Sequence, residues 1–540
     1  GTFIHNNGTV TFDATADYGQ RIQETATAAT AFYNLTHNRS ASSYHLYIKG
    51  DITVEKTLLN TSGFVNLYGP NTLTMGTATS AGAITMSSSG LRFYDNDASN
   101  YAKVYGVSSL YPFVYTGNEP DIDTYSTNAS HVALKNGDIQ VAMTSDYQAG
   151  IVRLDGDMEF DAVTINANDD FDINGQRAHF GGVLTINSGG DLRTTDGGLI
   201  IADANLLANG SIEDYDNADV NMIVNGGTGH DWRLGASGGG GHWCENILTN
   251  GTVTHGGDQI GPSSGSSAHA PKNIIVGSGT FAGNAANQPF YLQDLTIASG
   301  GTLTAGTGRL IDLYGDFTTT GGLLGASCLS FTSDKTGNAD QTAYAQVQDH
   351  ADLDFANSRN ALTLECWFKV DHNDTIDYLF DRRDGQDVFY LHVDGGSNTL
   401  KGRIYTSGTT SELTGATVIN DQKWHHCALV YDGDYSGSTT TSSHRLYVDG
   451  KLDAEEYGSG SVYASSSSMQ FGARYQWNSG FFLDGEMDEI RMFAAAKTAA
   501  QIRADMFKAE GTALTHFNSL ADGSTDGLIG RWSCNAGTGT

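Results

Sequence analysis

The chain has 540 residues, with 29 Lys and Arg against 61 Asp and Glu, which gives a formal net charge of −32. Its 67 glycines disfavour long helices, while 25 Tyr and 23 Phe argue against intrinsic disorder. The charge excludes a general nucleic-acid-binding surface, and no apolar run is long enough for a membrane span. We therefore expect a large, acidic, all-β protein, outside the cell or on a particle surface.

Residues 1–326 consist of short β segments separated by Gly, Asn and Asp turns, and three passages share one phrase (32–53, 180–192 and 292–318). The phrase runs from an aromatic residue through Leu-Thr or Leu-Thr-Ile to a glycine corner and a second short strand. Inward aliphatic residues alternate with outward Thr, Asn or Ser. This recurrence predicts an irregular parallel β-solenoid, in which each coil buries its aliphatic residues against its neighbours. A β-sandwich whose strands are similar only by composition stays open as an alternative.

The second half contains longer and more aromatic segments. Residues 363–370, 423–431 and 444–449 alternate cleanly between apolar and polar side chains, as strands do. Asp432-Gly433 and Asp449-Gly450 are typical of hairpin turns. One helix is predicted over residues 498–508, with Ile502 and Met506 on its apolar face. Five cysteines without a CxxC spacing predict core thiols rather than a disulfide framework.

Several phrases of the second half occur in the order typical of one family. These are Thr363–Phe368, Trp424–Gly433, Leu446–Lys451, Phe471–Arg474 and Phe482–Phe493. Through them, residues 328–534 resemble the laminin-G-like, concanavalin-A-like jelly-roll family. The resemblance implies an antiparallel β-sandwich. We expect a solenoid-like start at 1–80, an inserted or irregular β subdomain at 81–160, a solenoid-like region at 161–326 and a laminin-G-like domain at 327–540.

A shorter resemblance concerns residues 91–101, which are similar to a phrase common in structural and tail-fibre proteins of marine bacteriophages. A solenoid followed by a laminin-G-like module is also typical of phage fibres and of bacterial surface adhesins. The chain begins at Gly1 without Met and ends in mid-phrase, so we expect a piece of a longer polypeptide.

Two acidic groups raise the possibility of catalysis. One glucanase family with a jelly-roll fold uses the pattern E-x-D-x-x-E to place two carboxylates on one strand face. Here Glu486 and Asp488 fit that pattern, but Arg491 occupies the place of the second catalytic glutamate. In the first half Asp169, Asp170 and Asp172 are clustered, and turn aspartates explain them more simply. We therefore predict no catalytic residues.

Two binding sites follow from the resemblance and from residue type. Laminin-G-like modules frequently hold calcium, which prefers oxygen ligands, and no other cofactor is expected. The candidate calcium ligands, all at expected strand ends, are Asp371, Asp374, Asp384 and Asp484. Sugars stack on exposed aromatic rings beside polar partners. The candidate glycan-binding residues, in a loop between two family strands, are Arg474, Tyr475, Trp477 and Asn478.

The function expected from these features is structural attachment without catalysis, through many weak contacts multiplied by repeated copies. The setting expected first is the virion surface, as a phage fibre or a capsid decoration protein that contacts other subunits, forms a homo-oligomer and contacts cell-surface glycans. The alternative is a bacterial or archaeal cell-surface adhesin with a carbohydrate-binding module. The third possibility is a polysaccharide-degrading enzyme.

Overall fold

A computed structural model describes most of the chain and shows a nearly all-β protein in which 2% of the residues are helical. The described residues are 6–13, 20–22, 30–38, 45–87, 90–94, 101–117, 130–139, 141–142, 150–213, 220–230, 244–255, 271–283, 290–304, 311–331, 344–350, 353, 361–370, 376–384, 386–433, 444–463, 465–474, 481–509, 514 and 527–534. They form two compact units, one of residues 1–274, 281–295 and 304–316, and one of residues 275–280, 296–303 and 317–540. None of the described helices has the length and hydropathy that a membrane crossing requires.

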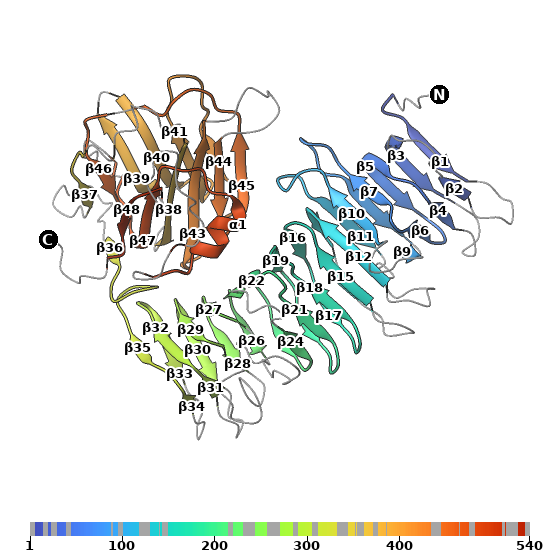
Figure 1. Ribbon diagram of the computed structural model, residues 1–540, viewed down its shortest axis with the longest axis horizontal. Coiled ribbons are helices and arrows are strands. Elements are labelled where there is room, and N and C mark those ends of the chain that lie inside the picture. The colour runs from blue at the N-terminus through green and yellow to red at the C-terminus, as the bar shows by residue number, and fades with distance from the viewer. Residues whose placement is uncertain are drawn as a thin grey trace. The chain divides into compact units, whose positions relative to one another are not determined.

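The first half is a parallel β-solenoid of about nine turns, as predicted (Figure 1). Equivalent positions in successive coils pair directly, because Asp170 is the partner of Asp191 and Asp191 is the partner of Ser211. These partners are 21 and 20 residues apart, which is the length of one coil. The paired strands are parallel, so the sandwich alternative for this half is wrong.

The solenoid strands form one large sheet and several small ones. The large sheet contains β1 (Thr9–Phe12), β3 (Thr30–His37), β5 (Ile52–Asn60), β7 (Thr72–Met75), β8 (Ala83–Met86), β10 (Ala102–Gly106), β11 (Phe113–Gly117), β12 (Ser130–Lys135), β13 (Gly137–Asp138), β15 (Gly150–Leu154), β16 (Met158–Phe160), β18 (Asp170–Asp172), β19 (Arg177–Phe180), β21 (Asp191–Arg193), β22 (Gly198–Ala202), β24 (Ser211–Glu213), β25 (Val220–Val224), β27 (Asn246–Thr249), β29 (Asn273–Val276), β32 (Asp294–Ile297) and β35 (Phe317–Thr319). The small sheets contain β2 (Gln20–Ile22), β4 (Leu46–Ile48), β6 (Val65–Tyr68) and β9 (Leu91–Tyr94); β14 (Val141–Ala142), β17 (Val163–Ile165), β20 (Leu184–Ile186) and β23 (Leu206–Ala208); β26 (Gly227–His230), β28 (Val253–His255), β30 (Gly279–Gly283) and β33 (Gly301–Thr304); and β31 (Phe290–Leu292) with β34 (Ile311–Leu313).

Side-chain ladders connect the coils of the solenoid. Inside, the rings of Phe160 and Phe180 stack with their centroids 5.3 Å apart. Along another line, Asn246 Nδ2 donates to Asn221 Oδ1 at 2.8 Å, and Asn273 Nδ2 donates to Asn246 Oδ1 at 3.2 Å. Like side chains therefore stack on like side chains from one coil to the next.

Residues 81–160, expected as an inserted or irregular subdomain, supply β10, β11, β12 and β15, which pair in parallel within the same sheet.

The second half is an antiparallel β-sandwich of the concanavalin A-like type. Its seven-stranded sheet contains β36 (Leu329–Phe331), β38 (Ala361–Val370), β43 (His425–Asp432), β44 (His444–Val448), β45 (Lys451–Glu456), β47 (Gly485–Phe493) and β48 (Leu528–Trp532). Its six-stranded sheet contains β37 (Ala345–Val347), β39 (Asp377–Asp384), β40 (Gln386–Asp394), β41 (Thr399–Ile404), β42 (Leu413–Thr414) and β46 (Met469–Phe471). One hydrophobic core lies between the two sheets, with Leu364, Leu391 and Leu429 fully buried in it.

The predicted turn and helix are present in the sandwich. Asp449 and Gly450 have φ angles of +47° and +70°, and they join β44 to the antiparallel β45. Such positive φ values match the tight hairpin turn that an Asp-Gly pair favours. Helix α1 (Ala499–Asp505) begins after the N-cap Thr498, and buried Ile502 packs against β43 and β44. It is shorter than the predicted span of 498–508.

The unit that contains the sandwich includes short segments that precede it in the chain. The Trp424 indole Nε1 is fully buried and donates to the carbonyl oxygen of Gly277 at 3.0 Å. The Ser299 hydroxyl donates to Glu486 Oε1 at 2.9 Å. Buried polar groups of the sandwich thus find partners in residues before position 327.

The five cysteines are free. Cys244, Cys366 and Cys427 are buried, as expected for core thiols, while Cys328 and Cys534 are half-buried. Cys366 and Cys427 are direct cross-strand partners on β38 and β43, and their Sγ atoms lie 3.6 Å apart.

Candidate functional site

Of the predicted glycan-binding residues, the structure describes Arg474, while Tyr475, Trp477 and Asn478 lie outside the described residues. Arg474 N–H donates to the carbonyl oxygen of Phe481 at 3.1 Å, and Ala473 forms a β-bridge with Phe482. The Arg474 guanidinium also lies 5.0 Å from the centre of the Phe481 ring. The two ends of the predicted loop are therefore held together, and one end carries a cation over an aromatic ring.

Aromatic and cationic side chains gather on the outer face of the six-stranded sheet. On β40, Tyr390 and His392 alternate with the core residues Phe389, Leu391 and Val393, so both point away from the core. We call the whole group the aromatic face. It comprises Tyr378, Arg383, Tyr390, His392, Arg403, Tyr405, Arg474 and Phe481.

The rings of the aromatic face form a continuous run. Phe481 meets Tyr378 edge to face, with the ring centres 6.1 Å apart, and Tyr378 lies 4.9 Å from His392. The His392 ring stacks on Tyr390 at 5.5 Å, and Tyr390 lies 6.0 Å from Tyr405. Such offset and edge-to-face pairs are favourable beyond the area that they bury. The run links the base of the predicted loop to the middle of the sheet.

Three guanidinium groups cover parts of this run. Arg383 lies 4.2 Å from the centre of the Tyr390 ring, and Arg403 lies 4.3 Å from that of Tyr405. Arg383 is fixed by an ion pair with buried Asp381 at 2.7 Å. The Tyr390 hydroxyl donates to Glu412. Tyr378, Tyr390 and His392 are at most 6% exposed, so a ligand can reach the face at its half-buried members, the rings of Phe481 and Tyr405 and the three arginines. There, aromatic edges, hydrogen-bond donors and positive charge lie close together, a combination that binds polar ring-shaped ligands.

His392 is neutral at pH 7. Burial, reinforced by the positive charges of Arg383, Lys401 and Arg474, lowers its pKa to about 4 against the opposing effect of Asp394. Its side chain is 6% exposed, and within the described part of the chain its Nδ1 has no hydrogen-bond partner. This nitrogen is itself buried, so a ligand hydroxyl can form a hydrogen bond with it only if a neighbouring side chain moves aside.

The structure describes two of the four predicted calcium ligands, Asp384 and Asp484. Asp371 and Asp374 lie outside the described residues, and Asp384 is the last residue of β39. Asp484 N–H donates to Asp377 Oδ1 at 3.0 Å. The part of the chain that the structure describes holds no group of three His, Cys, Asp or Glu side chains that could bind a metal ion. Calcium binding stays a prediction.

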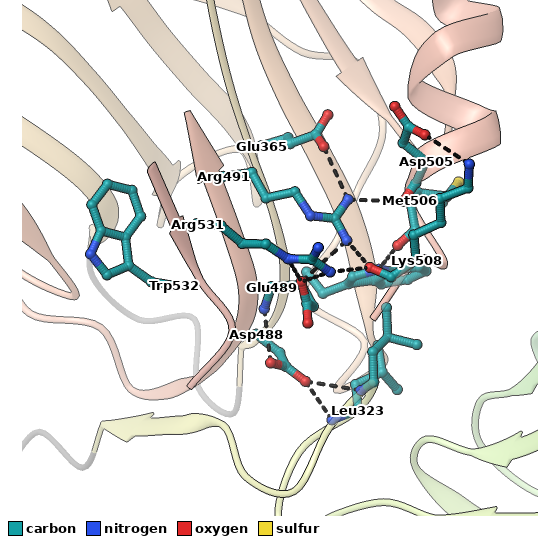
Figure 2. A network of polar contacts seen from close by, with 12 residues as sticks. Leu323, Glu365, Asp488, Glu489, Arg491, Asp505, Met506, Lys508, Arg531 and Trp532 are labelled. Atoms are coloured by element: carbon teal, nitrogen blue, oxygen red, sulfur yellow. Dashed lines mark hydrogen bonds and ion pairs between the residues drawn. The ribbon is translucent and has the colours of Figure 1, made fainter. Parts of the chain in front are cut away.

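The glucanase-like motif on β47 lies in a buried polar network (Figure 2). Asp488 Oδ2 accepts hydrogen bonds from the N–H groups of Leu323 at 2.7 Å and Leu324 at 3.0 Å. Arg491 Nη1 pairs with Glu365 at 3.1 Å, and Arg491 Nη2 pairs with Glu489 at 3.2 Å, with all three side chains fully buried. Burial raises the pKa of Asp488 to about 6.

The remaining carboxylate of that motif is also bound within the protein. Glu486 Oε2 lies 2.8 Å from Lys369 Nζ, and this pair is largely buried. The acidic cluster of the solenoid is likewise engaged in structure, because Asp170 pairs with Arg193 at 2.8 Å. On β19, Arg177 pairs with Glu159 at 2.8 Å and is likewise part of the structural framework.

Most of the aromatic face was missed by sequence reasoning. Its members come from three strands and a loop, and they meet through cross-strand register. Tyr390 is the direct partner of Arg403, and Tyr378 is the partner of His392. The available signal was the outward alternation of Tyr390 with His392 and of Arg403 with Tyr405.

Comparison with known proteins identifies the module. Residues 338–503 match the family described as the concanavalin A-like lectin/glucanases superfamily, which confirms the predicted resemblance for this part of the chain. No curated protein sequence matches the chain.

Three solved structures resemble part of the chain. A Bacteroides ovatus ATCC 8483 protein, provisionally assigned as carbohydrate binding, is 17% identical with a TM-score of 0.25, over 36% of this chain and 49% of that one. This chain therefore spans about half the length of that protein. The SAP-like pentraxin of Limulus polyphemus is 17% identical with a TM-score of 0.26, over 34% and 82%. Domain 4 of the arabinanase AbnA of Geobacillus stearothermophilus, in complex with arabinotriose, is 16% identical with a TM-score of 0.24, over 34% and 88%.

Proposed function

We propose that the C-terminal sandwich binds glycans on the aromatic face and that the protein is a non-enzymatic attachment protein. The observation that carries this proposal is the continuous run of rings from Phe481 to Tyr405, with arginines beside it. A pyranose ring stacks its apolar face on aromatic rings, while its hydroxyls exchange hydrogen bonds with Arg, His and carboxylate groups. The match of residues 338–503 to a superfamily of lectins and glucanases supports sugars as the ligand class.

The test uses a glycan array followed by titration calorimetry of the best ligand with the full chain. Tyr405→Ala removes a half-buried ring at the accessible end of the run. We expect a loss of affinity of about tenfold, or 1.4 kcal/mol, because aromatic anchors dominate binding sites of this kind. Tyr457→Ala is the matched control, since this tyrosine is 46% exposed on the same sandwich but does not belong to the aromatic face. Absence of any bound glycan, or equal losses in both variants, would contradict the proposal.

The absence of catalysis is part of the same proposal. Three groups support it: Asp488 is committed to backbone N–H groups, Glu486 to Lys369, and Glu489 to Arg491. A retaining glycosidase needs two carboxylates about 5–5.5 Å apart that both reach the substrate, and these are buried. Turnover on a panel of polysaccharides, abolished by Glu486→Gln, would establish the enzyme alternative instead.

The setting that we propose is the virion surface, where a solenoid with many copies would multiply weak glycan contacts. Mass spectrometry of purified particles and of the intact native protein tests this setting, and a cell-wall-anchored form would favour the adhesin alternative.

Calcium is retained as a proposed ligand of the sandwich. A rise in the unfolding temperature with calcium chloride, reversed by a chelator, is the expected result.

A further inference from the structure

Figure 1 shows the small sheet of β2, β4, β6 and β9 on the solenoid. A second group of aromatic and basic side chains lies on this sheet. The four strands pair in parallel, so that Arg21, Tyr47, Asn66 and Arg92 stand in one row across the sheet. We call this group the basic patch. It comprises Arg21, His45, Tyr47, Lys49, Phe64, Asn66, Tyr68 and Arg92.

The cations of the basic patch lie over its rings. Lys49 Nζ is 4.1 Å from the centre of the Tyr68 ring, and the Arg92 guanidinium is 3.6 Å from that of Phe64. Arg21 lies 5.9 Å from the Tyr47 ring. The rings also touch one another, with Tyr47 and Tyr68 centred 6.0 Å apart. The patch therefore has flat apolar surface and positive charge in alternation.

The charge of the basic patch is not neutralised by ion pairs of Arg21 or Lys49. Among the described residues neither side chain makes an ion pair with a carboxylate; their recorded partners are the rings of Tyr47 and Tyr68. Asp51, two residues after Lys49, instead accepts a hydrogen bond from Thr72 N–H at 2.7 Å. At physiological salt the Debye length is about 8 Å, so the acid surplus elsewhere on the chain is largely screened here. A chain with a net charge of −32 thus brings three cationic side chains together on one small sheet.

A buried acceptor lies in the same row. Asn66 is 2% exposed, and its Oδ1 has no hydrogen-bond partner among the residues that the structure describes. A buried acceptor without a donor is costly, so a ligand that brings a donor gains free energy. A sugar hydroxyl can donate such a hydrogen bond, which a sulfate or a fully ionised phosphate group cannot. The long side chains of Tyr47 and Arg92 flank Asn66 in register and must rotate to admit the hydroxyl.

We propose that the basic patch binds a carboxylate-bearing polysaccharide, a polymer of uronic acids. Sugar rings stack on Tyr47 and Tyr68, carboxylates pair with Arg21, Lys49 and Arg92, and a hydroxyl donates to Asn66. The guanidinium fork matches the planar carboxylate. Arg21 and Arg92 stand three strands apart, roughly 14 Å, so a chain of several sugars is needed to reach both. This site is separate from the aromatic face and does not depend on it.

The test is affinity electrophoresis and titration calorimetry of the full chain with polygalacturonate in 0.15 M salt, beside neutral dextran and dextran sulfate. We expect polygalacturonate to bind, dextran not to bind, and the double variant Arg21→Gln, Lys49→Gln to weaken binding about tenfold. Lys103→Gln is the matched control, because Lys103 Nζ lies 5.2 Å from the Tyr101 ring but β10 belongs to the large sheet. Circular dichroism shows whether each variant is folded.

The aromatic-face variant Arg403→Ala, Tyr405→Ala separates the two sites, since it should leave polygalacturonate binding unchanged. Four results overturn the proposal. They are no binding of polygalacturonate, binding of dextran sulfate alone, the same loss in Lys103→Gln as in the double variant, and a loss in the aromatic-face variant without one in the double variant.

Discussion

His425 shows how single residues set the electrostatics of the sandwich. It is buried between two carboxylates, with Nδ1 2.8 Å from Asp449 and Nε2 3.0 Å from Asp421. Burial by itself would lower the pKa of His425, but Asp449 and Asp421 outweigh it and raise the pKa to about 10. The pKa of the neighbouring His426 is shifted in the opposite direction, because burial lowers it to about 4. Adjacent residues on one strand thus differ in charge because they face opposite sides of the sheet.

The raised pKa of His425 predicts a loss of stability in alkaline solution. The folded protein holds this proton up to about pH 10, whereas the unfolded chain releases it near pH 6.5. The contribution is therefore complete below pH 6.5 and is lost as the pH rises to 10. We expect the free energy of unfolding in urea to fall by about 1–3 kcal/mol between pH 7 and 9.5, and to fall less in His425→Gln.

His444→Gln is the control for that measurement. His444 is equally buried, and its pKa is lowered to about 3 by burial, so it is neutral in both states across this range. The variant should keep the wild-type pH dependence between pH 7 and 9.5. A His425→Gln protein with an unchanged slope would show that the imidazolium is not retained in the folded state.

At the scale of the element, β47 departs from the alternation that its sequence predicts. Glu489 has a φ of +46°, and the pairing of β47 with β38 shifts at this position. The extra residue is a β-bulge, after which Ile490 points into the core and Arg491 points outward. A glutamate seldom takes a positive φ, so nothing in the sequence marks this bulge. By contrast, the Asp449-Gly450 turn and the Thr498 cap carry direct signals, and both were predictable.

The buried pairs of β47 make Arg491→Met strongly destabilising. The substitution removes Arg491 from Glu365 and Glu489, which have no exposed side-chain surface. Each carboxylate keeps one other cation, Lys497 for Glu365 and Arg531 for Glu489. Breaking a buried ion pair from one side costs about 3–5 kcal/mol, which should appear as a lower urea midpoint. The half-buried pair of Arg445 with Glu455, at 3.9 Å, provides the control Arg445→Met, for which less than about 1 kcal/mol is expected because water still reaches both groups. Equal midpoints for the two variants would refute a structural role of the network.

At the scale of the whole molecule, the repeated and family-like phrases of the sequence predicted the two folds, whereas the alternation within single strands did not predict the candidate sites. The solenoid was predictable because each coil repeats inward aliphatic positions, and the sandwich because its phrases resemble a family. The aromatic face was not, since Tyr378, His392 and Arg403 become neighbours only through strand register. The basic patch was missed for the same reason: its row takes one residue from each of four coils.

The solenoid should tolerate the removal of one complete coil. Deleting residues 171–191 joins Asp170 to Leu192, and since Asp170 pairs with Asp191, the new strand reads Asp-Leu-Arg as β21 does. Because each coil contacts only its neighbours, we expect a folded β protein with a lower free energy of unfolding. Deleting residues 171–180 removes half a coil and should prevent folding. Circular dichroism and urea unfolding compare the two, and equal behaviour would contradict the coil register.

The bond from Trp424 to Gly277 has a consequence for modularity. The chain changes character near residue 327, and a family boundary drawn there looks like a natural place to cut. A fragment that begins at residue 327 would lack Gly277, Ser299 and Leu323, which bind Trp424, Glu486 and Asp488. We therefore expect a fragment that begins at residue 327 to be destabilised by the loss of these three hydrogen bonds. The segments that the sandwich needs begin near Gly277, about fifty residues before the boundary drawn from the sequence. A fragment designed for transfer to another protein must therefore include that preceding stretch.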